Sequence, residues 1–354
     1  SLPARLILPR AVEGYPRALE GGEASTLALL GLVEKVAAGM DAAAVAAHHK
    51  DVFQFLLEVF DLRQAPPASL PQVGVVEDAA VAAFVALIMK LSESTFKPIF
   101  LQLLDWAVGA GQGAPARQLL FFRLVDRLAD RLRSVFVPYF AYLLDLCVEV
   151  LAAGAAAGGE APAPAKKKKV SKKSAARALA ETDKGTAWQL VLRVVRALHK
   201  CFLYDTKGFI DAARFEKLLP SLVSVLAARA PAAEDLAAPE AAGEGVAAMD
   251  SAVVEALGQL AVTVGSDIMW KQLNHQVLLC TRSEDVRPRL LGARVVASLA
   301  DRLKEEYLVL LPETIPFLAE LLEDTEPEVE ALAQELVQGL EKLSGEDLQQ
   351  YLTS

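Results

Sequence analysis

The sequence predicts an all-α protein built as a solenoid, in which antiparallel helix pairs stack along the chain. The prediction rests on a repeat in the last part of the sequence, where a helix pair with an acidic turn is followed by the same beginning again. Val286 in Asp-Val-Arg and Val329 in Glu-Val-Glu occupy the same place in successive units, 43 residues apart. Paired helices with a period of about 40–47 residues are typical of HEAT and armadillo repeats. One such pair cannot bury its own apolar face, so its neighbours are expected to be further repeats.

The composition agrees with this fold class. Hydrophobic residues make up 53% of the 354 residues and aromatic residues only 6%. The apolar residues are mainly Ala, Leu and Val, which suit close helix–helix contact better than an aromatic-rich β core. The longest uncharged apolar runs, such as residues 79–89, are too short to span a bilayer, so no membrane is expected. The sequence starts at Ser1 without a recognisable signal peptide, so we expect a fragment of a longer protein.

Helical periodicity continues through most of the chain. Residues 1–24, rich in Pro, Gly and Glu, are expected to form an irregular entry. Apolar residues at helical spacing then predict helices over residues 27–39, 52–60, 77–91, 96–108, 115–133, 135–151, 186–202, 212–228, 246–264 and 268–279. We divide the chain into an N-terminal helical repeat segment with a Pro-rich loop, residues 1–75, and a C-terminal HEAT-like repeat region, residues 76–354.

Two stretches interrupt the C-terminal repeat region. Residues 152–184 are rich in Ala, Gly and Pro and then basic, so a disordered insertion is expected. Residues 229–245 are expected to form a low-complexity loop.

Internal echoes support repetition on both sides of the insertion. Leu128-Ala-Asp-Arg-Leu132 recurs as Leu299-Ala-Asp-Arg-Leu303. Val137-Pro-Tyr-Phe140 is echoed by Ile315-Pro-Phe-Leu318. We expect each pair of strings to occupy equivalent places in the repeat.

The sequence offers no constellation prepared for catalysis, a cofactor or a metal. His48 and His49 are adjacent and point to different faces of a helix, while His199 and His275 stand alone. The three cysteines are far apart, which suits small buried apolar groups in a reducing compartment. We therefore expect a protein that is not an enzyme and that takes no cofactor and no small-molecule substrate.

A lysine-rich segment lies within the predicted insertion. It has seven positive charges in twelve residues and no acid, contributed by Lys166, Lys167, Lys168, Lys169, Lys172, Lys173 and Arg177. The string Pro-Ala-Lys-Lys-Lys-Lys-Val is similar to a nuclear import signal, which is read as an exposed cationic peptide. We favour a nuclear address or a non-specific RNA contact over a merely solubilising linker.

Stripes of basic residues are the second basic feature, although the net charge of −9 argues against a protein that coats nucleic acid over its whole surface. The stripes have helical spacing and consist of Arg123, Arg127 and Arg131; Arg193, Arg196 and Lys200; and Arg287 and Arg294. In a solenoid, equivalent positions of successive helices line one surface, so these residues are candidates for contact with an RNA backbone. The simpler interpretation is that each pairs with acids nearby, and we favour it for any single residue.

Four strings carry a family resemblance. They are Leu87-Ile-Met-Lys-Leu-Ser-Glu-Ser-Thr-Phe-Lys-Pro-Ile-Phe100 with Asp105-Trp106; Phe202-Leu-Tyr-Asp-Thr-Lys-Gly-Phe-Ile210; Trp270-Lys-Gln-Leu-Asn-His-Gln-Val-Leu-Leu279; and Tyr307-Leu-Val-Leu-Leu-Pro-Glu-Thr-Ile-Pro-Phe-Leu-Ala-Glu-Leu-Leu-Glu-Asp324. Together they resemble the C-terminal end of the very large HEAT-repeat subunit of the small-subunit processome, a scaffold associated with U3 small nucleolar RNA. The resemblance covers about residues 80–354 in order, with departures at the insertion and the low-complexity loop.

The resemblance implies a non-enzymatic scaffold of the nucleus and nucleolus. Proteins of this family belong to an early-binding subcomplex of the processome, which joins nascent pre-ribosomal RNA. They are needed for processing toward 18S rRNA and are linked to transcription of ribosomal DNA. The implied partners are WD-repeat proteins of the same subcomplex, the U3 snoRNP and pre-rRNA.

Two other classes stay open at this point. A HEAT-type nuclear transport or assembly adaptor would also be acidic and helical, but it should bind lysine-rich peptides rather than carry one. An enzyme built on a HEAT scaffold would need a concave cluster of acids or histidines, and the sequence offers none.

Overall fold

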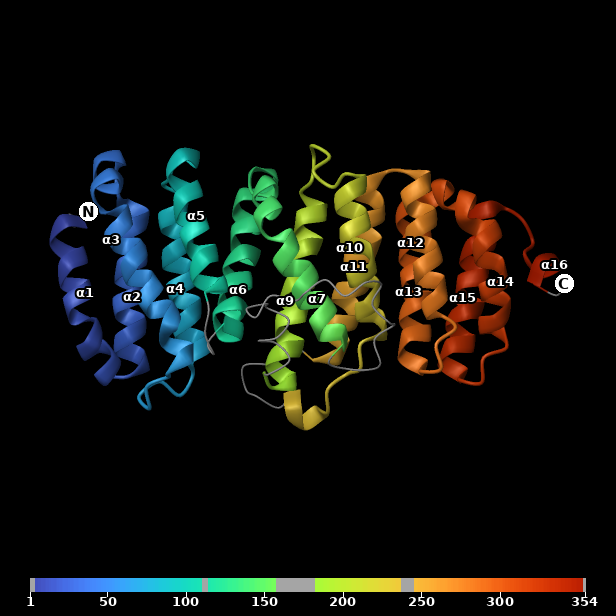
Figure 1. The fold of residues 1–354 in the computed structure, drawn as a ribbon, viewed down its shortest axis with the longest axis horizontal. Helices are drawn as coiled ribbons and strands as arrows, with labels where there is room; N and C mark the ends of the chain where they lie inside the picture. The colour runs from blue at the N-terminus through green and yellow to red at the C-terminus, as the bar shows by residue number, and fades with distance from the viewer. Residues whose placement is uncertain (1–3, 110–113, 157–181, 237–244, 353–354) are drawn as a thin grey trace, which may run out of the picture. The chain divides into compact units, whose positions relative to one another are not determined.

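The structure, a computed structural model, describes residues 4–109, 114–156, 182–236 and 245–352, and all regular structure in these residues is helical (Figure 1). The α-helices of the first half are α1 (Ala4–Glu20), α2 (Glu23–Gly39), α3 (Ala42–Phe60), α4 (Val73–Ile88), α5 (Glu93–Val108), α6 (Ala114–Leu132) and α7 (Leu144–Ala156). Those of the second half are α9 (Lys184–Leu203), α10 (Ala212–Ser224), α11 (Val246–Val264), α12 (Asp267–Cys280), α13 (Val286–Leu303), α14 (Leu311–Leu322), α15 (Pro327–Ser344) and α16 (Gln349–Leu352). The predicted fold class, an all-α solenoid of stacked helix pairs, is confirmed.

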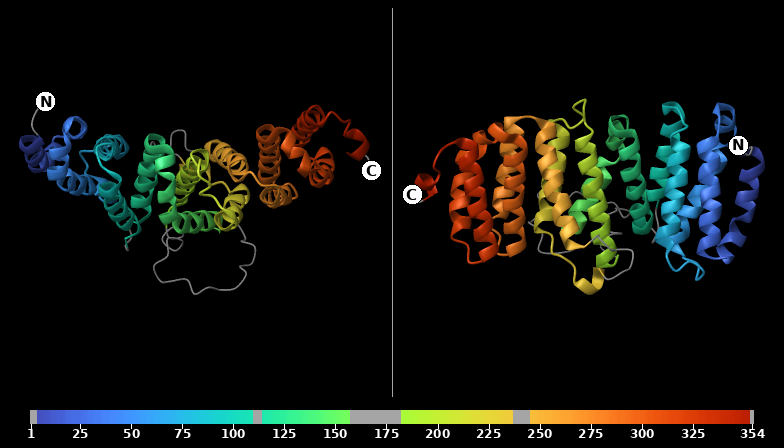
Figure 2. Two further views of the ribbon diagram at one scale, coloured as in Figure 1. Left: turned by 90° about the horizontal axis from the view of Figure 1, so that it is seen from above. Right: turned by 180° about the vertical axis from the view of Figure 1, so that it is seen from behind.

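The chain forms two compact units, residues 1–128 and residues 129–354. In the second unit, α9, α11, α13 and α15 pack side by side in one layer, while α7, α10, α12 and α14 form the other (Figure 2). In the first unit, α2 packs against α1 and α4, and α3 packs against α4. The units therefore separate within α6 rather than near residue 75, because α4 buries its apolar surface against the helices before it.

The predicted irregular entry at residues 1–24 is wrong, because α1 occupies most of it. Leu8, Ala11 and Tyr15 are spaced as one face of a helix and are buried. Pro9 and Pro16 lie inside this helix, where each removes a backbone N–H. Packing of the apolar face against α2 and α3 compensates for the lost hydrogen bonds.

The predicted insertion is shorter than the range 152–184. The helix α7 continues to Ala156, and α9 begins at Lys184 with the Asp183 side chain accepting a 2.8 Å hydrogen bond from Thr186 N–H. Within the predicted loop 229–245, residues 233–236 form one 3₁₀ turn. The remaining residues of both stretches, 157–181 and 237–244, lie outside the described residues.

The two Leu-Ala-Asp-Arg-Leu strings end their helices in the same way. Arg133 follows the first string and Lys304 the second, and both adopt a positive φ, of 47° and 55°. Each basic residue begins a 3₁₀ stretch, and three residues later Phe136 and Tyr307 are fully buried. The echo predicted from these strings is therefore a structural equivalence, and the chain changes direction at both.

The second pair of echoes does not occupy equivalent places. Pro138 lies in a 3₁₀ helix, residues 137–142, whereas Pro316 lies inside α14. The two prolines are also at different distances from the preceding Leu-Ala-Asp-Arg-Leu string. The similarity of these strings comes from shared composition, a proline among apolar residues, rather than from register.

Among the described helices, α11 is the one long and apolar enough to cross a membrane by length and composition. Half of its most apolar window is buried inside the fold, where α11 packs between α9 and α13. Burial between two neighbours in a layer accounts for this apolar composition.

Candidate functional site

Buried ion pairs join neighbouring repeats in the second unit. Arg289 of α13 donates two hydrogen bonds to Asp324, which precedes α15, at 2.7 and 2.9 Å. Only 13% of the arginine side chain and 8% of the aspartate side chain are exposed. Burial opposes ionisation of Asp324, but hydrogen bonds from Arg289 and the Glu326 N–H outweigh it and lower its pKa. The ion pair therefore fixes how α13 and the turn before α15 meet.

Arg287, one of the predicted stripe residues, makes a similar connection. Its guanidinium donates to Asp250 of α11 at 3.0 Å and to the Ala228 carbonyl oxygen at 2.5 Å. The same group lies 5.5 Å from the centre of the Trp188 ring. Arg287 therefore joins α13 to α11, to the end of the α10 segment and to α9, and it is not available to an RNA backbone.

Glu77 plays the corresponding part in the first unit, and the sequence did not single it out. Its carboxylate, in α4, is 3% exposed and accepts two 2.6 Å hydrogen bonds from Arg63. Arg123 of α6 donates to the same carboxylate at 3.3 Å and also pairs with Asp78. Two adjacent acids, Glu77 and Asp78, in an otherwise apolar helix were the signal that could have identified this buried pair.

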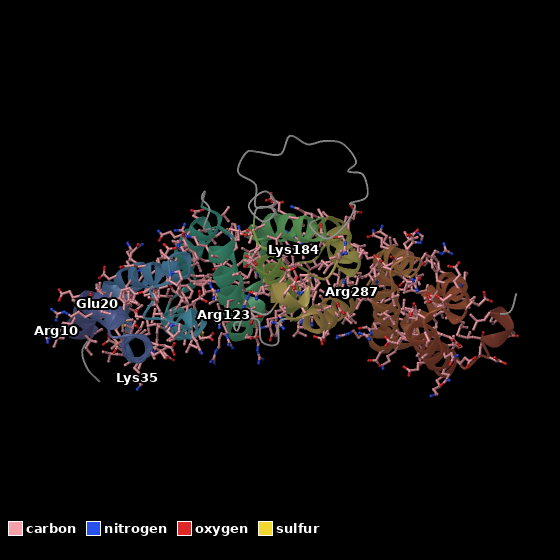
Figure 3. The ribbon with its side chains drawn as sticks, turned by 90° about the horizontal axis from the view of Figure 1, so that it is seen from below. Arg10, Glu20, Lys35, Arg123, Lys184 and Arg287 are labelled. Carbon is pink, nitrogen blue, oxygen red and sulfur yellow. The ribbon has the colours of Figure 1, made fainter. Side chains whose placement is uncertain are left out.

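The predicted basic stripes divide into paired and exposed residues. All eight lie on α6, α9 or α13, and Arg123 and Arg287 are drawn in Figure 3. Five have interaction partners: Arg123, Arg193, Arg196, Lys200, which donates to Asp130 at 2.6 Å, and Arg287. For these five the simpler interpretation, a basic residue engaged by its own chain, is the one that the geometry supports.

Three stripe residues remain exposed. Arg127 and Arg131 lie one turn apart on α6, and Arg294 lies on α13. None of the three has a hydrogen bond or ion pair to the part of the chain that the structure describes. The prediction of contact with an RNA backbone therefore still stands for these three residues. The lysine-rich segment, Lys166 to Arg177, lies outside the described residues.

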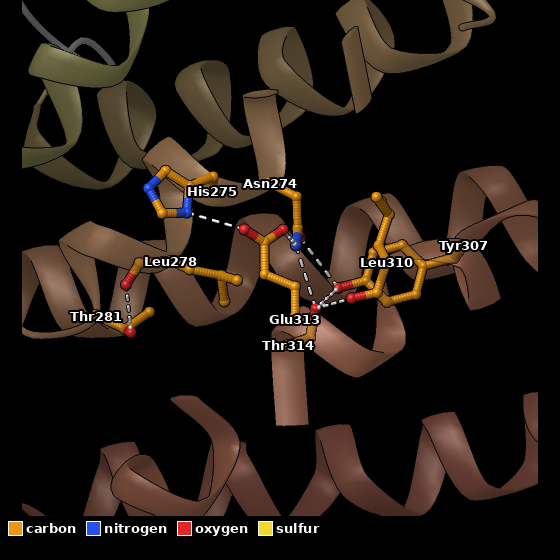
Figure 4. Close-up of polar contacts among 8 residues, drawn as sticks. All are labelled: Asn274, His275, Leu278, Thr281, Tyr307, Leu310, Glu313 and Thr314. Atoms are coloured by element: carbon orange, nitrogen blue, oxygen red, sulfur yellow. Dashed lines mark hydrogen bonds and ion pairs between the residues drawn. The ribbon is translucent and has the colours of Figure 1, made fainter. Parts of the chain in front are cut away.

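A closed network of polar groups lies between α12 and α14 (Figure 4). Asn274, Tyr307 and Thr314 are fully buried. The Asn274 amide donates to Thr314 Oγ1 at 3.2 Å and to Glu313 Oε2 at 3.1 Å, while the Tyr307 hydroxyl lies 3.0 Å from Thr314 Oγ1 and 3.3 Å from Asn274 Oδ1. At the surface, His275 Nδ1 lies 2.8 Å from Glu313 Oε1.

This network is structural in character. The Thr314 hydroxyl can donate to the Leu310 carbonyl oxygen at 3.0 Å, so each buried polar side chain of the network has a partner. Two of the four strings that carry the family resemblance, residues 270–279 and 307–324, meet here. Sequence reasoning missed the network, because Asn274 lies 33 to 40 residues from its partners, which belong to a different repeat.

The remaining nucleophilic and metal-binding candidates are dispersed. No group of three or more His, Cys, Asp or Glu side chains suited to a metal ion is present within the described ranges. Burial raises the pKa of the Cys147 and Cys201 thiols well above the ordinary value and raises that of Cys280 to about 11. Protonated thiols are poor nucleophiles and poor metal ligands. Burial also lowers the pKa of His199.

The fold class of this protein is that of the HEAT-like α-solenoids. One solved structure with a similar fold is the crystal structure of Kap121p bound to RanGTP, with a TM-score of 0.54. The similarity covers 98% of this chain and 38% of that chain at 12% sequence identity, so it concerns the fold alone.

Sequence comparison identifies the family. Residues 44–210 match the model of the BP28CT (NUC211) domain. Over 99% of its length the chain is 40% identical to an uncharacterized protein of Arabidopsis thaliana, 32% identical to human HEAT repeat-containing protein 1, and 29% identical to U3 small nucleolar RNA-associated protein 10 of Schizosaccharomyces pombe. The chain spans 15–19% of the length of these relatives. The resemblance to the large HEAT-repeat proteins associated with U3 small nucleolar RNA is therefore confirmed.

Proposed function

We propose that this chain is a scaffold segment of the U3 snoRNP and the small-subunit processome, acting in ribosome biogenesis in the nucleolus. The names of two relatives, each called U3 small nucleolar RNA-associated protein 10, support this role. The chain is non-enzymatic in this proposal: it contributes to pre-18S rRNA processing, is linked to ribosomal DNA transcription, and holds WD-repeat proteins of the early subcomplex.

The observation that carries the scaffold role is the locking of neighbouring repeats by buried polar contacts. The pair Arg289–Asp324 and the network around Asn274 each join elements that are 33 to 40 residues apart. Buried polar groups tolerate little sliding, because a displaced donor or acceptor would lose its partner without reaching water. Surfaces within a unit therefore keep a fixed spacing, as a scaffold for several partners requires.

We infer that RNA contact, where it occurs in the described residues, uses Arg127, Arg131 and Arg294. Guanidinium groups without a carboxylate partner can release counterions from a phosphate backbone, and paired ones cannot do so without losing their partner. Arg123 is unsuitable for a test of this idea. Its reversal to Glu would place a third carboxylate beside Glu77 and Asp78 and would damage the fold.

The RNA contact is tested by filter binding of a single-stranded pre-rRNA spacer fragment at several salt concentrations. The variant Arg127→Glu/Arg131→Glu/Arg294→Glu should bind more weakly, and the slope of log K against log salt should fall by about 2 for three lost contacts. The matched control is Arg10→Glu/Arg17→Glu/Lys35→Glu, which makes the same charge change on α1 and α2. Equal affinity and slope for the two triple variants would overturn the RNA contact and leave the scaffold role intact.

The scaffold role is tested by tagging the chain in cells and identifying the RNA and proteins that co-purify at moderate salt. U3 RNA, pre-rRNA spacer and WD-repeat proteins are the expected result. Recovery of import cargo bearing lysine-rich signals, without U3 RNA, would favour the alternative of a nuclear transport or assembly adaptor.

A further inference from the structure

A groove lies between α1 and α3 in the first unit, where α1 packs against both α2 and α3. One part of it is a hollow of about 330 Å³ with walls that include Leu8, Val33 and Phe55. A second, shallower hollow continues from it along α3 and shares Val12, Asp51 and Phe55 with the first. We call this continuous feature the α1/α3 groove. Its volume lies in the range of sites that bury side chains of a ligand.

The floor of the α1/α3 groove is apolar. Leu8, Val52 and Phe55 are buried beneath it, and Val12 stands at its mouth with 40% of its surface exposed. The aromatic ring of Phe55 is held in place by an edge contact with Tyr15, at 5.2 Å between ring centres. The groove therefore offers a preformed apolar surface rather than a flexible one.

The rim of the groove consists of carboxylates. On α3, Asp51 and Glu58 flank Phe55 on the same helical face, and on α1 Glu13 lies beside Val12. Glu13 and Glu58 are exposed and have no ion pair with any residue that the structure describes. Within the described residues, the ion-pair partner of Asp51 is His48, whose Nδ1 lies 3.9 Å from the carboxylate.

The two prolines of α1 add further acceptors. Pro9 and Pro16 cannot donate to the carbonyl oxygens of Arg5 and Val12, four residues earlier, so these oxygens lack their ordinary helical partner. Val12 lines the groove itself, and Arg5 lines a neighbouring hollow that shares His48.

The lysines and arginines of this region lie away from the α3 side of the carboxylate rim, where His48 is the neighbour of Asp51. Arg10 and Arg17 project from the side of α1 opposite to Leu8 by their helical spacing, and they lie three and four residues from Glu13 on that helix. Arg5 and Lys35 line the neighbouring hollow at the far end of the groove. The α3 side of the rim, around Phe55, therefore presents hydrogen-bond acceptors and negative charge to whatever enters the groove.

We propose that the α1/α3 groove docks a basic amphipathic α-helix of a partner protein. Apolar side chains of the partner, spaced three and four residues apart, insert between Val12 and Phe55, while its Lys or Arg side chains pair with Glu13, Asp51 and Glu58. A groove between two helices, with an apolar floor and no strand edge, is the surface that binds such a helix rather than an extended peptide. The acidic rim selects the charge of the partner and excludes acidic helices by repulsion.

The test places a photo-cross-linking amino acid at Val12 of the tagged chain in cells. The control position is Ile268 on α12, which is 72% exposed and lies in the other unit. Mass spectrometry of the cross-linked peptides should identify, at Val12 only, a segment of another polypeptide with apolar residues at helical spacing and an excess of Lys and Arg. The double variant Glu13→Lys/Glu58→Lys should reduce this cross-link about tenfold.

Glu20→Lys is a single charge-reversal control, because Glu20 is exposed on α1 and lines neither part of the groove (Figure 3). It should leave the cross-link unchanged. Three results would overturn the proposal: cross-linking at Val12 no greater than at Ile268, a cross-linked segment that is acidic or belongs to the same polypeptide, or equal yields in the Glu13→Lys/Glu58→Lys and Glu20→Lys variants. Since the three glutamates are exposed, circular dichroism of each variant should match that of the parent chain.

Discussion

The buried network between α12 and α14 can be tested by removing one hydroxyl group at a time. Thr314→Val keeps the shape of the side chain and removes a group that contacts Asn274 and Tyr307. One N–H of the Asn274 amide then loses its partner in a fully buried place, while the other keeps Glu313. An unsatisfied buried donor costs about 1–3 kcal/mol, so we expect Thr314→Val to lower the free energy of unfolding by about 2 kcal/mol.

A double-mutant cycle with Tyr307→Phe isolates the contact between the two hydroxyls. Tyr307→Phe alone leaves Asn274 Oδ1 without its 3.3 Å donor, at an expected cost of about 1–2 kcal/mol. Each single variant removes the 3.0 Å contact between Tyr307 and Thr314, so the sum of their costs counts this contact twice. The double variant should therefore be less destabilised than the sum by about 1 kcal/mol.

Urea unfolding followed by circular dichroism measures these differences, and hydrogen exchange in α12 and α14 localises them. Thr281→Val is the control, because Thr281 is also buried but its hydroxyl donates only to the Leu278 carbonyl oxygen of its own helix (Figure 4). Its cost should stay below about 1 kcal/mol. Equal costs for Thr314→Val and Thr281→Val, together with an additive cycle, would refute the view that the network locks the two repeats.

Two further predictions concern the backbone and the ion pair of the second unit. Lys304→Gly and Arg133→Gly should each stabilise the chain by about 1 kcal/mol in urea unfolding, because glycine adopts a positive φ without strain, whereas Lys304→Ala should not. Arg289→Ala should cost about 3 kcal/mol at neutral pH by leaving the buried Asp324 carboxylate without its partner. Because the pKa of Asp324 is lowered in the folded state, this stability is present above the unfolded value of about 3.9 and is lost as the pH falls through the folded value. The stability difference between the parent chain and Arg289→Ala should therefore shrink below about pH 4, and a constant difference down to pH 2 would contradict the assignment.

The fold class could be predicted from the sequence because the signal is repeated. Helical spacing and the acidic turns occur more than once, and the 43-residue interval between Val286 and Val329 relates successive units, so local errors do not change the conclusion. Among the long helices of the described residues, α1 was missed, and it contains Pro9 and Pro16. These residues normally indicate a loop, and only packing against α2 and α3, which a local pattern does not contain, overrides them.

The polar contacts could not be predicted in the same way, because helical spacing says which residues share a face but not what lies opposite. Arg123 and Arg127 are one turn apart and have the same pattern, yet Arg123 is held by Glu77 and Asp78 while Arg127 is exposed. The difference arises on α4, about one repeat earlier in the chain. Glu77 is buried there because α4 is apolar on most sides, so its charge must be paired within the fold.

The number of residues between the two members of an ion pair suggests a rule for predicting such pairs from the sequence. The same number also shows where the rule fails. Arg287–Asp250, Arg289–Asp324 and Arg282–Glu320 join residues that are 35 to 38 positions apart, close to one repeat. An arginine with an acid one repeat away is therefore a candidate for pairing. Arg294 has Glu255 and Glu330 at 39 and 36 positions, yet it is exposed and has no ion pair to either. Arg287 and Arg294, two turns apart, share a face by spacing, but only Arg287 lies at the helix start, where Ala228, and Asp250 near the start of α11, are within reach. Position along a helix does not by itself decide pairing, because Arg123 in the middle of α6 is held by acids of α4 while Arg131 in the last turn of the same helix is exposed. What decides it is whether the neighbouring helix places an acid opposite, and only where it does not can a partner's phosphate or carboxylate bind without breaking a contact of the fold.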